Sequence, residues 1–500
     1  MTALSELLPA GGAGKVMDFV ASGTLPNGKA VVLKSDGTVE VVGETSTAVS
    51  ESIPAGSAAV FNSGDTENTS VAFDPNTVGK FVVVYKDVGN SNYGTAVVGT
   101  VSGTSLSFGS EYIFNSAASY IPNIAFDPNT AGKFVVVYED GGNGSRGTAI
   151  VGTTSGTTLA FGSSYAFAIN PGTSSHIISF DPNTTGTFVV AYRGSSGPGT
   201  ATIGIVSGTT ITYGSEYVYS TTSTGNPSVS FDPNTAGKFV VIYSDAGNLS
   251  YGKAIVGTVS STAISFGSKY TYAAYYVGYN SISFDPNTTG TFVIAYMNAD
   301  NSDHGRTRVG TYSGTSITFG TEVVFNSNTT SYISVAFNPN ASGKVVISWK
   351  YSAGHINTGT VTGTSITLGT TVLATPVSVN ADHLDFAFDP NYSGKFVMVY
   401  KNWSNLEYGE AILGQFATTI TTTNLTSTNF VGIATEAIAD TATGSITLQG
   451  GVSTNQSSLT SGSTYYVQAD GTVSTVSTAP AVNIGKALNA TTLKLKGLSV

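Results

Sequence analysis

One phrase occurs seven times in this chain and limits the folds that the chain can adopt. The phrase reads Phe-(Asp/Asn)-Pro-Asn, continues through a glycine, and enters an apolar run that in the first copy is Phe-Val-Val-Val-Tyr, residues 81–85. The copies begin at Phe73, Phe126, Phe180, Phe231, Phe284, Phe337 and Phe388, so that successive copies are 51 to 54 residues apart. A regular period of this length is typical of supersecondary units that stack on their neighbours.

Each copy predicts four antiparallel strands. Asp-Pro-Asn indicates a tight turn, and the glycine that follows supplies the positive φ that closes such a turn. The apolar run has no polar alternation, so we expect it to be covered on both faces. Two more strands follow, which in the first copy are Thr95–Ser102 and Ser105–Phe114. Four strands in each of seven copies predict an all-β fold, a seven-bladed β-propeller, with an open solenoid as the alternative.

The two ends of the repeat array favour the propeller over the solenoid. Ahead of the first copy, Ile53–Phe61 matches the fourth strand at Leu106–Phe114 position for position. The seventh copy supplies three strands, at Asp385–Asp389, Phe396–Tyr400 and Glu410–Phe416, and then leaves the pattern. We therefore expect the N-terminal strand to complete the last blade, which would close the ring and leave no exposed sheet edge.

The flanks of the array contain two related hairpins. Val31–Val39 and Tyr465–Val473 share an Asp-Gly-Thr-Val turn, with apolar residues at matching positions on either side. We interpret residues 1–45 and 425–500 as two parts of one small β base domain, into which the propeller, residues 46–424, is inserted. Two independent flanking modules are the alternative.

Charge and composition exclude several classes of protein. The net charge is −10 at pH 7 with no basic patch, which disfavours binding to nucleic acid. The chain has no cysteine, so disulfides, thiolate zinc sites and cysteine nucleophiles are excluded. Residues 1–15 lack the basic start and apolar centre of a secretory signal, and no window of about 18 apolar residues could span a membrane. We expect a chain that stays in the cytoplasm where it is made, does not insert into membranes, and needs neither cofactor nor metal.

One face of the predicted propeller varies between copies. The Asp-Pro-Asn and Ser-Gly-Thr turns of one face recur almost unchanged, whereas the loops of the other face differ in every blade, and binding usually resides in such loops. A planar side chain recurs just before the third strand, and the loops between blades add Tyr120, Tyr275, Tyr276, Tyr279 and Tyr332. The candidate glycan-binding residues are Tyr93, Arg146, Tyr251, His304, Trp403 and Tyr408. Such side chains can stack on sugar rings, or they can simply cover the gaps between blades.

Catalysis has little support in the sequence. A sialidase-type site needs several converging arginines, and the four arginines, Arg146, Arg193, Arg306 and Arg308, are spread over three copies. A glycosidase pair could be drawn only from the carboxylates of the variable face, Asp300, Asp303, Asp382 and Glu407. We expect a protein that is not an enzyme.

Short segments of the two flanks carry a resemblance to a known family. These segments are Leu8–Gly12, Asp18–Gly23, Asn429–Ala434, Thr464–Val467 and Ile484–Leu488. They resemble the framing segments of structural proteins of tailed bacteriophages, especially tail-fibre and virion-surface proteins. The resemblance implies a virion component that is assembled in the host cytoplasm, has other virion proteins as partners, and can form a homo-oligomer.

The resemblance and the variable face together predict a function. We expect non-covalent recognition of a host surface polysaccharide or receptor. The alternatives are a purely architectural part of the tail or capsid, and a polysaccharide depolymerase.

Overall fold

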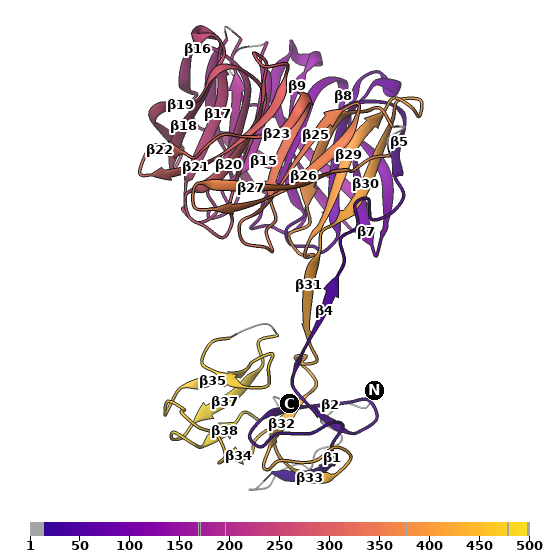
Figure 1. Cartoon of the computed structure of the whole chain (residues 1–500), viewed down its shortest axis with the longest axis vertical. Helices are drawn as coiled ribbons and strands as arrows, with labels where there is room; N and C mark the ends of the chain where they lie inside the picture. The colour runs from indigo at the N-terminus through magenta and orange to yellow at the C-terminus, as the bar shows by residue number, and fades with distance from the viewer. Residues whose placement is uncertain are drawn as a thin grey trace. The chain divides into compact units, whose positions relative to one another are not determined.

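Each copy of the repeated phrase forms antiparallel strands in an all-β chain, as predicted. The structure, a computed structural model, describes residues 15–168, 170, 172–195, 197–376, 379–477 and 480–497. Within those residues the only helices are three 3₁₀ turns, Val88–Asn90, Gly141–Asn143 and Ala246–Asn248, and none is long and apolar enough to cross a membrane. The chain divides into two compact units, Ser50–Thr418 and the combination of Met1–Val49 with Thr419–Val500 (Figure 1).

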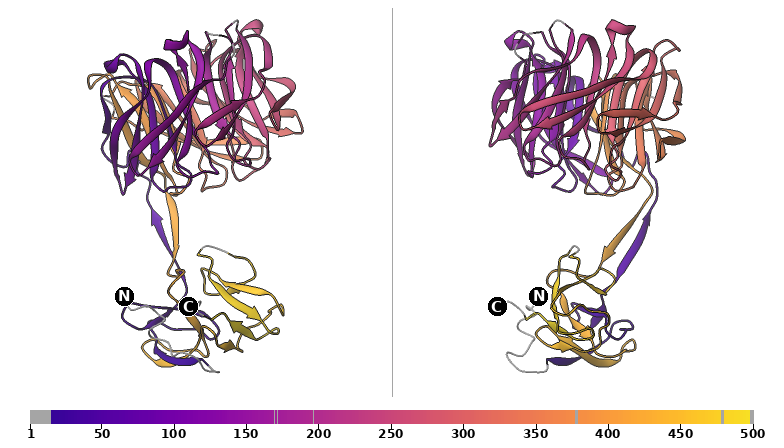
Figure 2. Two further views of the ribbon diagram at one scale, coloured as in Figure 1. Left: turned by 180° about the vertical axis from the view of Figure 1, so that it is seen from behind. Right: turned by 90° about the vertical axis from the view of Figure 1, so that its left-hand side faces the viewer.

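The second and third strands of each repeat are regular. The second strands are β6 (Lys80–Asp87), β9 (Lys133–Asp140), β13 (Thr187–Arg193), β17 (Lys238–Asp245), β20 (Thr291–Asn298), β25 (Lys344–Tyr351) and β29 (Lys395–Asn402). The third strands are β7 (Tyr93–Ser102), β10 (Arg146–Ser155), β14 (Pro198–Ser207), β18 (Tyr251–Ser260), β21 (His304–Ser313), β26 (Ala353–Thr362) and β30 (Tyr408–Gln415). Figure 2 shows the strands of the Ser50–Thr418 unit from two further sides.

The fourth strand of one copy often continues without a loop into the first strand of the next copy. In β8 (Ser105–Phe126), residues up to Ala118 pair with β7, and residues from Ser119 pair with β9. The other continuous strands are β5 (Ala59–Phe73), β16 (Tyr217–Phe231) and β19 (Ala263–Phe284). Elsewhere the two strands are separate. The separate pairs are β11 (Thr158–Ala166) and β12 (Ser174–Phe180), β23 (Val323–Thr329) and β24 (Ser331–Phe337), and β27 (Ser365–Leu373) and β28 (Ala381–Phe388). Two short segments, β15 (Thr210–Tyr213) and β22 (Ser316–Phe319), precede β16 and β23. The predicted loops between copies are therefore partly strand.

The apolar run of each copy is the centre of its sheet. Phe81–Tyr85 in β6 is buried at every position, as the absence of polar alternation predicted. Gly79, in the preceding turn, has φ 69°, also as predicted. The sequence did not reveal why a second glycine recurs in the third strand. A Cβ on Gly99 would lie 2.0 Å from Cζ of Phe81, so only glycine leaves room for the neighbouring ring.

The aspartate of the repeated turn joins neighbouring copies at five of the junctions. Oδ1 of Asp74 accepts a hydrogen bond from the Asn76 amide at 2.9 Å, which holds the turn. Its Oδ2 accepts a bond from the amide of Gly132 in the second copy, at 3.1 Å. The same bond links later copies, from Gly186 to Asp127, Gly237 to Asp181 and Gly290 to Asp232, at 3.0 to 3.2 Å. The seventh copy bonds the first, from Gly79 to Asp389, at 2.8 Å.

The first strand of the unit pairs with the last repeat, as predicted. Ala59, Val60 and Asn62 of β5 lie opposite Ala411, Glu410 and Gly409 of β30. Phe61 and Phe81 of the first copy share a core cluster with Val397 and Leu413 of the seventh. The hydrogen-bonded path runs β11-β10-β9-β8-β7-β6-β5-β30-β29-β28, and none of the described sheets closes on itself.

The second unit combines strands from both flanks of the repeat array. One five-stranded sheet runs β1-β33-β32-β2-β3, from β1 (Val16–Val20), β2 (Ala30–Leu33), β3 (Val39–Val41), β32 (Phe430–Ala434) and β33 (Thr443–Leu448). Another runs β34-β38-β37-β35-β36, from β34 (Val452–Ser453), β35 (Thr464–Val467), β36 (Val473–Ser474), β37 (Asn483–Ala487) and β38 (Leu493–Leu495). β4 (Glu44–Val49) and β31 (Thr418–Thr423) pair with each other. The boundary between the two compact units lies after Val49, the last residue of β4, and after Thr418, the first residue of β31.

Both hairpins that the sequence predicted are present in this unit. Leu33 pairs with Val39 and Val467 pairs with Val473. In each turn the carboxylate of the aspartate, Asp36 or Asp470, accepts a hydrogen bond from the backbone amide of the threonine two residues later.

Candidate functional site

Every first strand of the repeat unit contains a β-bulge with one residue in the left-handed region. In the first copy Glu67 lies opposite Lys86 and Ser70 lies opposite Val84, which leaves Asn68 and Thr69 opposite a single residue. The left-handed residues are Asn68, Ile121, Ser175, Asn226, Tyr279, Tyr332 and His383, with φ from 46° to 51°. Each stands five residues before the phenylalanine that begins a copy. Bulges redirect side chains and occur often beside functional sites.

These bulges surround a central cavity of about 400 Å³. Its lining consists of one short segment from each repeat: Asn68–Ser70, Ile121–Asn123, Ser175–Ile177, Asn226–Ser228, Tyr279–Ser281, Tyr332–Ser334 and His383–Asp385. The seven first strands therefore meet around one space. Sequence reasoning missed this cavity, because its residues lie about one repeat apart and only two of the left-handed positions carry asparagine, the residue type that would indicate such a conformation.

An aromatic wall lines one side of the central cavity. The rings of Tyr279 and Tyr332 lie 5.4 Å apart, and those of Tyr332 and His383 lie 5.1 Å apart. Burial, reinforced by the nearby Asp382 carboxylate, raises the pKa of the Tyr332 phenol, so the hydroxyl stays protonated at neutral pH. Burial lowers the pKa of His383, which keeps its imidazole uncharged. The wall therefore presents three neutral planar groups.

Asp385 connects three repeats at the cavity. Its carboxylate accepts hydrogen bonds from the hydroxyl groups of Ser334 and Ser70, both at 3.2 Å, and from the amides of Val71 and Phe386. Asp385 also belongs to the lining of the cavity. Burial nevertheless raises the pKa of Asp385 to about 6, although the four donors act in the opposite direction. Asp385 thus fixes hydroxyl groups of the first and sixth copies at the cavity lining.

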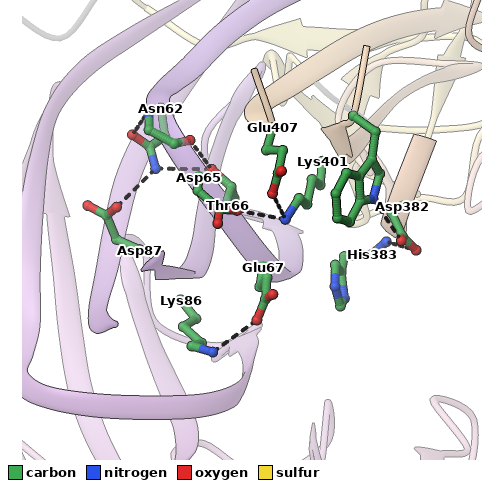
Figure 3. Close-up of polar contacts among 12 residues, drawn as sticks. Asn62, Asp65, Thr66, Glu67, Lys86, Asp87, Asp382, His383, Lys401 and Glu407 are labelled. Carbon is green, nitrogen blue, oxygen red and sulfur yellow. Dashed lines mark hydrogen bonds and ion pairs between the residues drawn. The ribbon is translucent and has the colours of Figure 1, made fainter. Parts of the chain in front are cut away.

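A charged cluster lies where the seventh copy meets the first. Nζ of Lys401 lies 2.6 Å from Asp65 and 2.5 Å from Glu407, and the lysine side chain is only 1% exposed. Burial lowers the pKa of Lys401, but the two carboxylates more than compensate and hold it above its usual value. Figure 3 shows Lys401 between Asp65 and Glu407, with Asp382 and His383 nearby.

Trp403 is exposed on this cluster in a fixed orientation. Its side chain is 47% exposed, and the Lys401 ammonium lies 4.3 Å from the ring centroid. The indole Nε1 donates to Oδ2 of Asp382 at 3.0 Å, while Oδ1 of Asp382 pairs with Lys350 at 3.1 Å. Burial raises the pKa of Asp382, but the hydrogen bonds from Trp403 and Lys350 and the charge of Lys350 have the larger combined effect. The pKa therefore lies below its usual value, and the anchoring carboxylate stays ionised. A planar aromatic surface is thereby held open to solvent among polar groups.

The structure does not bring the six candidate glycan-binding residues into one pocket. Five of them occupy the first position of a third strand, each in a different repeat: Tyr93, Arg146, Tyr251, His304 and Tyr408. None of the six lines the central cavity. Tyr408 pairs with Asp65 and so lies beside the cluster that holds Trp403. Their role in binding stays a prediction.

Three of the four candidate carboxylates are engaged by neighbours. Asp382 and Glu407 each pair with a lysine, and Asp300 accepts from the Tyr276 amide at 3.1 Å. His176 is only 3% exposed, and burial lowers its pKa to about 4. Among the residues that the structure describes, no three His, Cys, Asp or Glu side chains are placed to share a metal ion.

Comparisons with known proteins bear on the fold. No family model matches the chain, and no curated protein matches it. Among solved structures, the BP39L lectin from Burkholderia pseudomallei is similar with a TM-score of 0.56 and 7% identity, over 72% of this chain and 99% of the lectin. Identity this low shows a shared fold alone.

Two further solved structures are similar at lower TM-scores. The β-propeller domain of Cps50 (Swd1) from Myceliophteria thermophila has a TM-score of 0.47 and 9% identity, over 71% of this chain and 99% of that domain. The Aleuria aurantia lectin in complex with Fucα1-6GlcNAc has a TM-score of 0.41 and 14% identity, over 62% of this chain and 97% of the lectin. The all-β chain thus has β-propeller and lectin structures among its neighbours.

Proposed function

We propose that this protein is a structural protein of a tailed-phage virion, a tail fibre or similar appendage, that binds a glycan of the host surface without cleaving it. The binding unit is Ser50–Thr418, a seven-bladed β-propeller in which the N-terminal strand completes the seventh blade. Seven repeats, the turn bonds between successive copies, and the core shared by the first and seventh copies support this reading.

The terminal unit serves as the base that attaches the propeller to the particle. Strands from both flanks share one sheet and one core, which includes Val32 and Phe430, so both ends of the repeat array are held by a single small body. The flanks also carry the segments that resemble phage structural proteins. Other virion proteins are the partners of this base, and copies of the chain can assemble there.

The exposed and anchored Trp403 is the observation that carries the glycan proposal. Sugars offer apolar C–H faces and hydroxyl edges, so their sites combine an aromatic platform with fixed polar groups. Trp403 provides the platform, and Asp382, Glu407 and Asp65 provide carboxylate oxygens around it. Because Asp382 and Lys401 already fix the indole, little side-chain freedom is lost when a ligand stacks on it.

Trp403→Ala should weaken binding of the purified protein to host cells by about 30-fold, the effect of removing a central aromatic contact. Trp403→Phe keeps an aromatic surface and loses the hydrogen bond to Asp382. Its binding should therefore be weaker than that of the unchanged protein and stronger than that of Trp403→Ala. Val78→Ala, an exposed position in a repeated turn, is the control and should bind as the unchanged protein does. Equal binding by Trp403→Ala and the control would remove the proposal.

The virion role has a separate test. Antibodies against the Ser50–Thr418 unit should label the tail or surface of purified particles of the phage that encodes this chain, and the chain should be found in those particles by mass spectrometry. Particles that lack the chain would refute the virion part of the proposal and leave the glycan part standing.

A further inference from the structure

We propose that the central cavity receives the terminal, uncharged sugar residue of the glycan, which stacks against the aromatic wall of Tyr279, Tyr332 and His383. The inference rests on the proposed function, since it assigns a second contact to the same ligand. Trp403 would then contact the chain of sugars, and the cavity would contact its end.

The size of the cavity fits the end of a glycan better than a long stretch of it. Its volume of about 400 Å³ lies near the lower end of the roughly 300–1,000 Å³ that small-molecule sites span. The cavity is lined by segments of all seven first strands and not by the two sides of a groove. A linear run of several sugar residues would instead require an open groove.

The two sides of the cavity match the two kinds of surface on a sugar ring. Tyr279, Tyr332 and His383 form the planar side. Hydroxyl and amide groups from other repeats supply donors and acceptors around the same space, at Asn68, Ser175, Asn226 and Ser228. Aromatic stacking with a few well-placed polar groups is the usual composition of a site for a small polar ligand.

The aromatic wall occupies three of the seven cavity positions that the repeat holds in the left-handed backbone region. Tyr279, Tyr332 and His383 all adopt positive φ, 49°, 48° and 48°. Asparagine adopts this conformation more readily, and the equivalent positions of the first and fourth copies do carry it, Asn68 and Asn226. Residues held in unfavourable backbone regions concentrate at ligand sites, where the fold needs a particular side chain.

The charges near the cavity select against an acidic sugar. The carboxylate of Asp385 lies in the lining, and Asp382 and Glu67 lie close enough to help raise the pKa of the Tyr332 phenol. The lysines near the wall are already paired, Lys350 with Asp382 at 3.1 Å and Lys401 with Asp65 and Glu407. A uronic or sialic acid would therefore meet like charge, whereas an uncharged residue would not.

The test is a titration with neutral oligosaccharides released from the host surface polysaccharide, followed by calorimetry and saturation-transfer NMR. Tyr279→Asn and Tyr332→Asn remove the rings and place asparagine where the backbone favours it, so both variants should fold, which thermal unfolding checks. Each should weaken binding by about tenfold. Ser261→Asn, at a left-handed position (φ 57°) in a repeated turn that does not line the cavity, is the matched control and should stay within about twofold.

Further outcomes separate this inference from the proposed function. In the unchanged protein the terminal sugar should receive the strongest saturation transfer, and oligosaccharides ending in a uronic acid should bind at least about tenfold more weakly. If Trp403→Ala weakens binding while Tyr279→Asn and Tyr332→Asn do not, the cavity is not the site and the proposed function stands. If the unchanged protein binds no saccharide, the proposed function itself fails.

Discussion

Replacing Phe61 by alanine should lower the free energy of unfolding of the Ser50–Thr418 unit by about 3–5 kcal/mol, the range for truncating a buried phenylalanine. Phe61 is 5% exposed and its ring lies 5.2 Å from that of Tyr85. The ring also fills the space over Gly409 in the last repeat, where a Cβ would lie 2.4 Å from its Cε2. One side chain thus packs the first and last copies together. Urea denaturation followed by tryptophan fluorescence measures the loss.

Phe114→Ala is the matched comparison for this experiment. Phe114 occupies the equivalent position between the first and second copies, 5.2 Å from Tyr138 and above Gly94. The two variants should lose similar stability if the first strand is bound as firmly as an interior one. A loss below about 1 kcal/mol for Phe61→Ala alone would mean that the N-terminal strand contributes little, and the proposed ring would fail.

Gly257→Val should have the other large effect, a loss of about 3 kcal/mol or more through overpacking. A Cβ at Gly257 would lie 2.1 Å from Cζ of Phe239, a side chain with 0% exposure between two repeats. The branched side chain cannot turn away from the ring, because the Cβ itself collides. The measurement is the denaturation midpoint of the unit, or the soluble yield where the variant does not fold.

Two further variants test the cause. Phe239→Leu combined with Gly257→Val should be more stable than Gly257→Val alone, because the shorter side chain vacates the space that the new methyl groups need. Gly208→Asn should change the free energy of unfolding by less than about 0.5 kcal/mol, since nothing lies within 4 Å of its Cβ position and asparagine accepts its φ of 61°. A loss at Gly208 as large as that at Gly257 would contradict a steric explanation.

Local sequence signals predicted the strands well. The apolar run Phe81–Tyr85, the glycine turn at Gly79 and the Asp-Gly-Thr-Val hairpins each act within a few residues, so their patterns are complete in the sequence. The pairing of Ala59–Asn62 with β30 was also predictable, because the two ends of the array are complementary fragments of one repeat.

Contacts between repeats were not predictable from these signals. Asp-Pro-Asn indicated a tight turn, which Oδ1 of Asp74 holds, but no sequence signal showed that Oδ2 bonds Gly132 in the next copy. The central cavity likewise needs seven residues, one from each repeat, to meet in space. The left-handed bulge at Ile121 or Tyr279 gives no sequence signal, since neither residue type favours that conformation.

The candidate site was predictable in part. The sequence predicted Trp403 as a candidate glycan-binding residue. Its anchoring by Asp382 and Lys401 was not predictable, because it depends on tertiary contacts. The burial of His176 likewise depends on the fold, because the alternation of β12 turns its side chain into the interior.

The bond from Gly79 to Asp389 bears on how the repeat unit comes apart. A linear array frays from its outermost members, which have a neighbour on one side only. In the proposed ring the first and last members are neighbours of each other, so no member is outermost and partial loss has no natural starting point. The unit should therefore resist heat and proteases as a whole until the seam between β5 and β30 opens, and then lose its structure in one step.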